Sequence, residues 1–207
     1  MKFDASKVQS ETNFSVSYQI SSTIGQGEGV KMPIERLHHV AYRCLDAKET
    51  VEFYEEYLDL QFDSAIAENI VPSTGERYPH IHIFMRMADG SSVAFFELPE
   101  SPAAIADPNT PFWVQHLALK VDDRSSLISY KKRLEEGGIE VLGPINHTFC
   151  ESLYFKDPNG HRLELTSDIA SEELLRKMET EARPLLEIWD TTREAPEVNA
   201  LHTSARP

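Results

Sequence analysis

The sequence is poor in cysteine, with Cys44 and Cys150 as its only two among 207 residues. Two cysteines so far apart are too few for a disulfide framework, and they lack the close spacing of a structural zinc site. We therefore expect both to be reduced thiols, and we place Cys44 in a β-strand.

Long apolar runs are also missing. No stretch of about 18 apolar residues, as a membrane-spanning helix would need, is present. Residues 1–32 contain no apolar segment of signal-peptide length. These two absences predict a cytoplasmic protein with no membrane partner.

Basic residues are scarce. The chain has 20 Lys and Arg against 34 Asp and Glu, which gives a formal net charge of -14. Nucleic acids and anionic membranes attract positive surfaces, so this balance disfavours both as partners. The hydrophobic content of 41% is ordinary for a globular protein, and the length suits one compact domain or two small ones.

One segment recurs along the chain. Residues His39–Asp46, HVAYRCLD, align 77 residues later with His116–Asp123, HLALKVDD. Each copy has a histidine, a strand-like run with a basic residue at the same place, and an acid positioned to cap a helix. This pattern indicates a repeated supersecondary unit.

Helical patterns follow both copies. Asp46 and Glu49 have the spacing of a capping box, and apolar residues then recur at helical intervals over 51–58. A similar stripe covers 127–134, and Gly137 supplies a helix stop. Each unit therefore begins as a strand followed by a helix.

Strand patterns come next in each unit. Turn signals separate strand-like runs in two predicted antiparallel hairpins, which comprise residues 80–87 with 91–98 and residues 153–156 with 161–165. Residues 139–143 add a further strand. The coarse pattern is βαβββ twice, which predicts an α+β fold.

The domain organisation follows from these patterns. We predict an N-terminal arm over 1–33, a domain over 34–168 with modules at about 34–99 and 112–168, and a C-terminal helix and flexible tail over 169–207. We expect this helix near 171–189, interrupted or kinked at Pro184. The two terminal extensions could cover sheet edges or form a dimer contact.

The turn Asp157–Gly160 affects the surroundings of Glu164. A carboxylate between Leu163 and Leu165 is costly to bury without a cation or hydrogen bonds. We predict a three-residue hairpin loop with a bulge, which places Tyr154 opposite Glu164 on one face of the sheet. A two-residue loop would turn Tyr154 to the other face.

Four residues are candidate metal ligands. His39 and Glu97 in the first unit, and His116 and Glu164 in the second, occupy places that we take as equivalent. Imidazoles and carboxylates suit a divalent ion such as Fe, Mn, Co, Ni or Zn. Two histidines and one carboxylate leave positions for a substrate, whose bound oxygen would be polarised.

Each candidate also has a structural explanation. A single strand histidine is commonly a packing residue, but the matched positions of His39 and His116 favour ligands. For Glu97 two explanations are about equally good: it is a metal ligand, or it is an acid that ends a strand and faces solvent. His80 and His82 alternate on one strand face and could approach the pocket or face solvent.

Three stretches resemble the vicinal oxygen chelate superfamily, which includes glyoxalase I, type I extradiol dioxygenases and bleomycin-binding proteins. They are LHHVAYRCLDAKETVEFYEEYLDLQF, VQHLALKVDD and SLYFKDPNGHRLELT, and the resemblance covers about residues 35–168. It implies paired βαβββ modules that form a curved, open barrel around a divalent metal. It also implies ligands at His39, His116 and Glu164, with Glu97 at the fourth ligand of glyoxalase-type members.

The segment before Glu164 resembles extradiol dioxygenases. By this resemblance, the protein is a metal-dependent enzyme with Fe(II), which cleaves a catechol-like substrate with O2 after the substrate binds through two adjacent oxygens. His147 would act as acid or base, and Tyr154 would hydrogen-bond the substrate.

Two alternatives remain open. One is a glyoxalase-like lyase or isomerase that uses Zn, Ni or Co, with Glu97 in the metal shell. The other is a protein that sequesters a flat small molecule without chemistry. The sequence also leaves open whether the site lies within one chain or between two copies in a homodimer.

Overall fold

The computed structural model describes residues 34–104 and 107–196, and the N-terminal arm predicted over 1–33 lies outside this part. The described residues from Arg36 onwards belong to one unit. The first module contains β1 (His39–Cys44), α1 (Ala47–Leu58), β2 (Gln61–Ile70), β3 (Arg77–Arg86) and β4 (Ser92–Glu97). The second contains β5 (Leu117–Lys120), α2 (Arg124–Glu136), β6 (Leu142–Asn146), β7 (Cys150–Lys156) and β8 (Arg162–Asp168). The last element is α3 (Glu172–Thr192).

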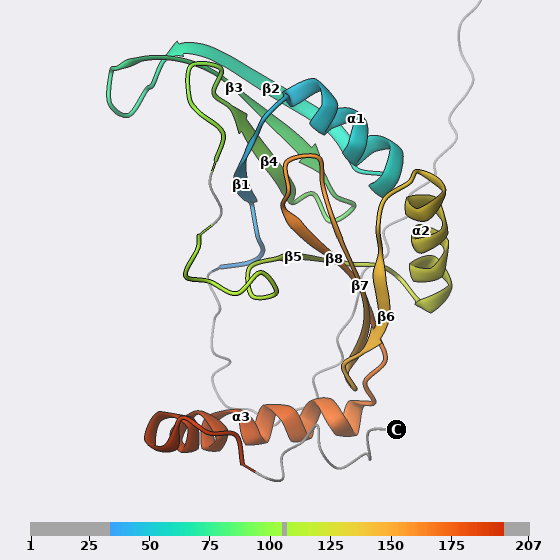
Figure 1. The fold of residues 1–207 in the computed structure, drawn as a ribbon. Coiled ribbons are helices and arrows are strands. Elements are labelled where there is room, and N and C mark those ends of the chain that lie inside the picture. Colours follow the sequence, from blue (N-terminus) through green and yellow to red (C-terminus); the bar gives the residue numbers. More distant parts are fainter. Residues whose placement is uncertain (1–33, 105–106, 197–207) are drawn as a thin grey trace, which may run out of the picture. The chain divides into compact units, whose positions relative to one another are not determined.

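The predicted α+β fold with two βαβββ modules is confirmed. The strands form two four-stranded sheets, ordered β1-β4-β3-β2 and β5-β8-β7-β6 (Figure 1). In each sheet the first strand pairs in parallel with the last, and the other pairs are antiparallel. Both sheets are open, so β1 and β5 are edge strands.

The helix caps are formed as predicted. Asp46 accepts a hydrogen bond of 2.9 Å from the backbone N–H of Glu49, and Asp123 accepts one of 2.8 Å from that of Ser126. These bonds satisfy N–H groups that lack a partner within the helix. The caps thus set where α1 and α2 begin.

Two element boundaries differ from the sequence prediction. The strand expected over 139–143 pairs instead over Leu142–Asn146, and Ile139 and Val141, which precede it, pack against the core. The C-terminal helix, predicted near 171–189, runs over Glu172–Thr192 with Pro184 inside it. Among the described residues, no helix is long and apolar enough to span a lipid bilayer.

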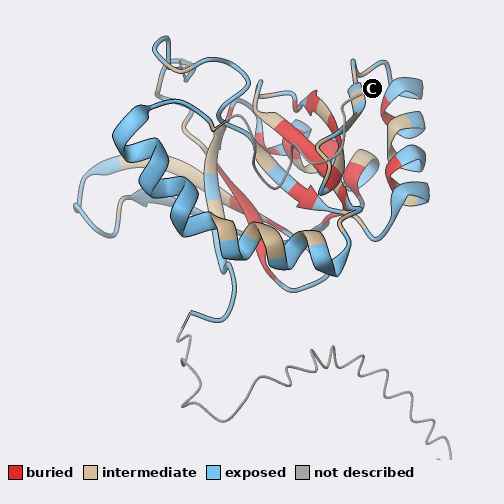
Figure 2. Cartoon of the chain, turned by 90° about the horizontal axis from the view of Figure 1, so that it is seen from below, coloured by how far each residue is buried: buried red, intermediate tan, exposed pale blue. Residues whose placement is uncertain are grey.

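The core is one hydrophobic cluster to which both modules contribute. It includes Tyr54 of α1, Phe95 of β4, Leu127 of α2 and Leu163 of β8. The buried residues concentrate in the sheets and on the inner faces of α1 and α2, whereas α3 has no buried residue (Figure 2). The two free cysteines are also buried, in β1 and β7.

The tip of the β7–β8 hairpin joins the second module to α1. The backbone N–H of Asp157 donates to the carbonyl of His161, and Gly160 has a φ of 84°, as the predicted bulged loop requires. The Asn159 side chain donates to the hydroxyl of Thr50 at 3.1 Å and accepts from the backbone N–H of Leu45 at 2.8 Å. This joint fixes the orientation of β8.

Candidate metal centre

The pairing of β1 with β4 separates two of the candidate ligands. His39 lies beside Ser92 and Cys44 beside Glu97, so His39 and Glu97 project from opposite faces of the sheet. The Glu97 carboxylate accepts a hydrogen bond of 2.7 Å from the backbone N–H of Ala47, at the start of α1. Glu97 therefore faces the helix, and His39 faces away from it.

The register also identifies the true counterpart of Glu164 in the first module. Ala118 pairs with Glu164 in the second sheet, and the matching Ala41 pairs with Ala94 in the first. The prediction that Glu97 is the counterpart of Glu164 is therefore wrong, and Ala94 occupies that position. The spacing along the chain indicated the wrong residue, because the strands between the two positions differ in length. In the first module β2 and β3 have ten residues each, whereas in the second β6 and β7 have five and seven.

His116 and Glu164 form a close pair in the second module. The Nε2 atom of His116 lies 2.9 Å from a carboxylate oxygen of Glu164, whose side chain is almost fully buried. The Nδ1 atom of His116 lies 2.9 Å from the carbonyl oxygen of Val114. Because a carbonyl only accepts, Nδ1 carries the proton.

This arrangement fits a cation. With its proton on Nδ1, a neutral His116 turns the lone pair of Nε2 towards the carboxylate of Glu164. Two such electron-rich atoms are held 2.9 Å apart only when a proton or a metal ion lies between them. A histidine oriented through Nδ1 by a backbone carbonyl is also a common arrangement for metal ligands.

A chain of hydrogen bonds extends from this pair. The hydroxyl of Tyr154 donates to the second carboxylate oxygen of Glu164 at 3.1 Å, and Nε2 of His147 lies 2.8 Å from the same hydroxyl. Tyr154 lies directly opposite Glu164, so the predicted bulged register is confirmed. Burial and then the Glu164 charge raise the pKa of Tyr154, which keeps the hydroxyl protonated as a donor.

The exposed face of the first module carries further histidines. The Nδ1 atoms of His38 and His39 are 2.8 Å apart, and the rings of His39 and His82 are 6.0 Å apart. His82 stacks on Phe96 with ring centres 3.7 Å apart. Burial, followed by the neighbouring His39 and His80, lowers the pKa of His82, so its imidazole is neutral near pH 7.

Sequence reasoning left the role of His82 open. Its signal was the alternation with His80 along one strand, which fits a solvent-facing strand equally well. The structure buries the Nε2 atom of His82 without a hydrogen-bond partner, on the same face of the sheet as His39. The buried surroundings of His82 distinguish it from a solvent-facing histidine, whereas its spacing from His80 does not.

The chain brings together only part of the predicted ligand set. Among residues 34–104 and 107–196, no three His, Cys, Asp or Glu side chains lie close enough to hold one metal ion. His116 and Glu164 form their pair, while His39 lies with His38 and His82. His39 and His116 are both exposed, and each stands at an edge strand.

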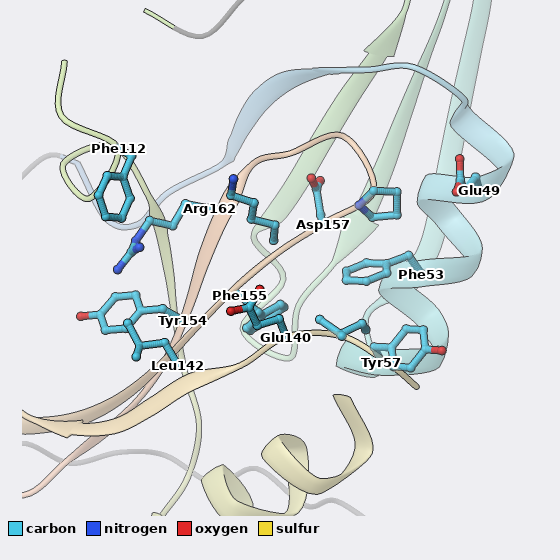
Figure 3. A pocket seen from close by; sticks show the side chains of 13 residues that line it. Glu49, Phe53, Tyr57, Phe112, Glu140, Leu142, Tyr154, Phe155, Asp157 and Arg162 are labelled. Carbon is cyan, nitrogen blue, oxygen red and sulfur yellow. The ribbon is translucent and has the colours of Figure 1, made fainter. Parts of the chain in front are cut away.

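A cavity of about 620 Å³ extends from Tyr154 towards α1 (Figure 3). Phe112, Leu142 and Arg162 line it near Tyr154, and Phe53 lies on the side of α1. Its wall combines apolar and aromatic surface with a few polar groups, as small-molecule sites commonly do. A cavity of this kind suits a flat organic molecule.

These features agree with a comparison of the whole chain. Residues 36–165 match the family described as the Glyoxalase/Bleomycin resistance protein/Dioxygenase superfamily, and the chain belongs to this superfamily. A glyoxylase/bleomycin resistance protein/dioxygenase domain from Frankia sp. EAN1pec has the same fold, with a TM-score of 0.55 and 18% identity. The match covers 66% of this chain and 99% of that domain.

Two relatives from Bacillus subtilis (strain 168) are named for ring cleavage. The inferred ring-cleaving dioxygenase MhqA is 27% identical over 138 residues, which cover 66% of this chain and 42% of MhqA. A catechol-2,3-dioxygenase is 35% identical over 82 residues, which cover 39% of this chain and 28% of that protein. The chain thus spans less than half the length of either relative.

Proposed function

We propose that the protein is an extradiol-type dioxygenase, which opens the ring of a catechol-like substrate and adds both atoms of O2 to it. The observation that carries the proposal is the hydrogen-bonded series His116, Glu164, Tyr154 and His147. In this proposal His116 and Glu164 act as metal ligands, and the hydroxyl and the imidazole beside them handle the protons of a substrate. The two Bacillus relatives support this choice of reaction.

The proposed metal ligands are His116 and Glu164 of one chain and His39 of a second copy. One chain leaves His39 apart from the pair, although both histidines are exposed, His39 at the start of edge strand β1 and His116 just before edge strand β5. Just before β5 two large apolar side chains are exposed, Trp113 at 60% and Val114 at 42%. A second copy would cover this surface and the unpaired strand edges.

The absence of a second carboxylate on this face, among the residues that the structure describes, supports iron over a glyoxalase-like centre. The counterpart of Glu164 in the first module is Ala94, and Glu97 is bonded to the start of α1. Two histidines and one carboxylate form the usual set for non-haem Fe(II), which would bind both adjacent substrate oxygens and O2 and make the substrate hydroxyl more acidic.

The side chains around the centre have separate roles in this proposal. The Tyr154 hydroxyl, which donates its single proton to Glu164 in the free protein, would turn that proton to a substrate oxygen once Glu164 holds the metal, and so orient the ring. His147, at 2.8 Å from that hydroxyl, accepts a proton from the substrate and returns it to the ring-opened product. The largely apolar cavity excludes water from the ring.

The test is oxygen uptake by protein loaded with Fe(II) under anaerobic conditions and then supplied with a panel of catechols. The proposal predicts consumption of O2 together with the strong visible absorbance of a ring-opened product. If the iron form consumes no O2 with any catechol, while a Ni or Zn form isomerises hemithioacetals, a glyoxalase-like function replaces it.

A further inference from the structure

The guanidinium group of Arg162 is held between two aromatic rings. Its central carbon lies 4.2 Å from the ring centre of Tyr154 and 5.8 Å from that of Phe112 (Figure 3). Stacking of this kind fixes the plane of a guanidinium and leaves the N–H groups at its edge available. Arg162 is thus a positioned donor within the wall of the cavity.

Arg162 has no acidic partner in an acidic protein. Within residues 34–104 and 107–196, no carboxylate lies within 4.0 Å of its nitrogens, and its buried Nε atom has no hydrogen-bond partner. By contrast, Arg77, Arg86 and Arg124 each form an ion pair. The chain carries 34 acidic residues. An ordered arginine that pairs with none of the described carboxylates therefore points to an anion that the protein binds from solution.

A second cation faces the same place. Lys156 pairs directly with Arg162 across the β7–β8 hairpin, so both side chains project from one face, and both line the cavity. Like charges at directly opposed positions destabilise a hairpin unless an anion lies between them. Glu49 and Glu140 also line the cavity, but neither forms an ion pair with Arg162 or Lys156 among the described residues.

We infer that Arg162, assisted by Lys156, binds a carboxylate group on the substrate, and so selects aromatic substrates with an acidic side chain. The inference rests on the proposed function, because Tyr154 links the two sites. Its ring supports Arg162, and its hydroxyl bonds to the candidate ligand Glu164. The fork of N–H groups on Arg162 matches the two oxygens of a carboxylate, and Phe112 offers a surface for the carbon skeleton.

Direct binding separates this inference from the question of catalysis. Calorimetry compares phenylacetate with its neutral analogue phenylacetamide as ligands of the full chain, in the wild type and in Arg162→Gln, Arg162→Lys and Arg124→Gln. Arg124→Gln is the matched control, because it removes the same charge from an exposed arginine of α2 that is paired with Glu151 of β7. Thermal melting of each variant shows that it remains folded.

The wild type should prefer phenylacetate by about ten- to a hundredfold, as expected for charge-assisted hydrogen bonds. Arg162→Gln should lose this preference, Arg162→Lys should keep part of it, and Arg124→Gln should keep all of it. A wild type that binds neither ligand, or shows no preference, overturns the inference, as does an unchanged preference in Arg162→Gln. If the preference depends on Arg162 but no catechol is cleaved, the anion site stands and only the proposed reaction fails.

Discussion

The hydroxyl of Tyr54 on α1 donates a hydrogen bond of 3.2 Å to the carboxylate of Asp157 in the β7–β8 turn. Both side chains are buried, and the bond joins the two modules. Asp157 also accepts from the backbone N–H groups of Asn159 and His161. The turn that precedes Arg162 and Glu164 is therefore anchored to the first module.

Removal of this bond should destabilise the fold. Tyr54→Phe leaves the buried Asp157 with one donor fewer, so we expect the free energy of unfolding to fall by about 1.5–3 kcal/mol. Urea denaturation followed by circular dichroism measures it. Tyr57→Phe, on the same helix and half-buried, is the control and should change stability by less than about 0.5 kcal/mol. Equal losses in the two variants would mean that the bond to Asp157 has no special weight.

Glu97 should matter for stability and not for metal binding. Glu97→Ala removes an acceptor from the first N–H of α1, which should cost about 0.5–2 kcal/mol, as for a lost helix cap. Glu164→Ala should instead abolish tight metal binding. Measurement of metal content and unfolding on both variants checks this contrast. Loss of the metal in Glu97→Ala would contradict this expectation and would indicate that Glu97 is a metal ligand.

Two inactive variants should complement each other if the site combines two chains. In a mixed dimer of His39→Ala and His116→Ala, one site keeps both histidines and the other loses both. Random pairing of equal amounts should therefore recover about one quarter of the wild-type activity. Activity that stays at the level of the separate variants after subunit exchange would place all three ligands in one chain.

Tyr154 and His147 should act on turnover without changing the metal content. Tyr154→Phe removes the hydroxyl that links His147 to Glu164, and His147→Ala removes the proposed acid or base. We expect kcat to fall by about a hundredfold or more in His147→Ala, as is typical for the loss of general acid–base catalysis. Steady-state oxygen uptake measures it, and unchanged turnover in both variants would remove this pair from the mechanism.

The Cys44 thiol should be unreactive in the folded protein. Burial raises its pKa from 9.0 to about 11, so its thiolate fraction at pH 8 is about a hundredfold lower than in the unfolded chain. Iodoacetamide labelling at pH 8, followed by mass spectrometry of peptides, should show slow modification of Cys44 in buffer and rapid modification in urea. Similar rates under both conditions would contradict the buried environment.

Much of the fold could be predicted because its signals are local. The two copies around His39 and His116 include their own helix caps, and the turn at Asp157–Gly160 fixes which residue faces Glu164. These patterns depend on spacing within one hairpin or one helix. The position of Tyr154 opposite Glu164 was therefore predicted correctly.

The remaining features depend on pairing between distant strands. The parallel register of β1 and β4 determines on which face of the sheet Glu97 lies. The sequence alone did not give this register, because the intervening strands differ in length between the two modules. The stacking of Arg162 on Phe112 joins β8 to a segment with no regular structure. The separation of His39 from His116 and Glu164 depends on how the two modules pack together. No local sequence pattern predicts this packing.

Elemental analysis of the full chain, purified under anaerobic conditions, tests the proposed centre most directly. The account predicts about one iron per chain in the wild type and none in His116→Ala, because two histidines and one carboxylate are the ligand set of non-haem Fe(II) sites. Zinc or nickel in place of iron, or iron retained by His116→Ala, would contradict it.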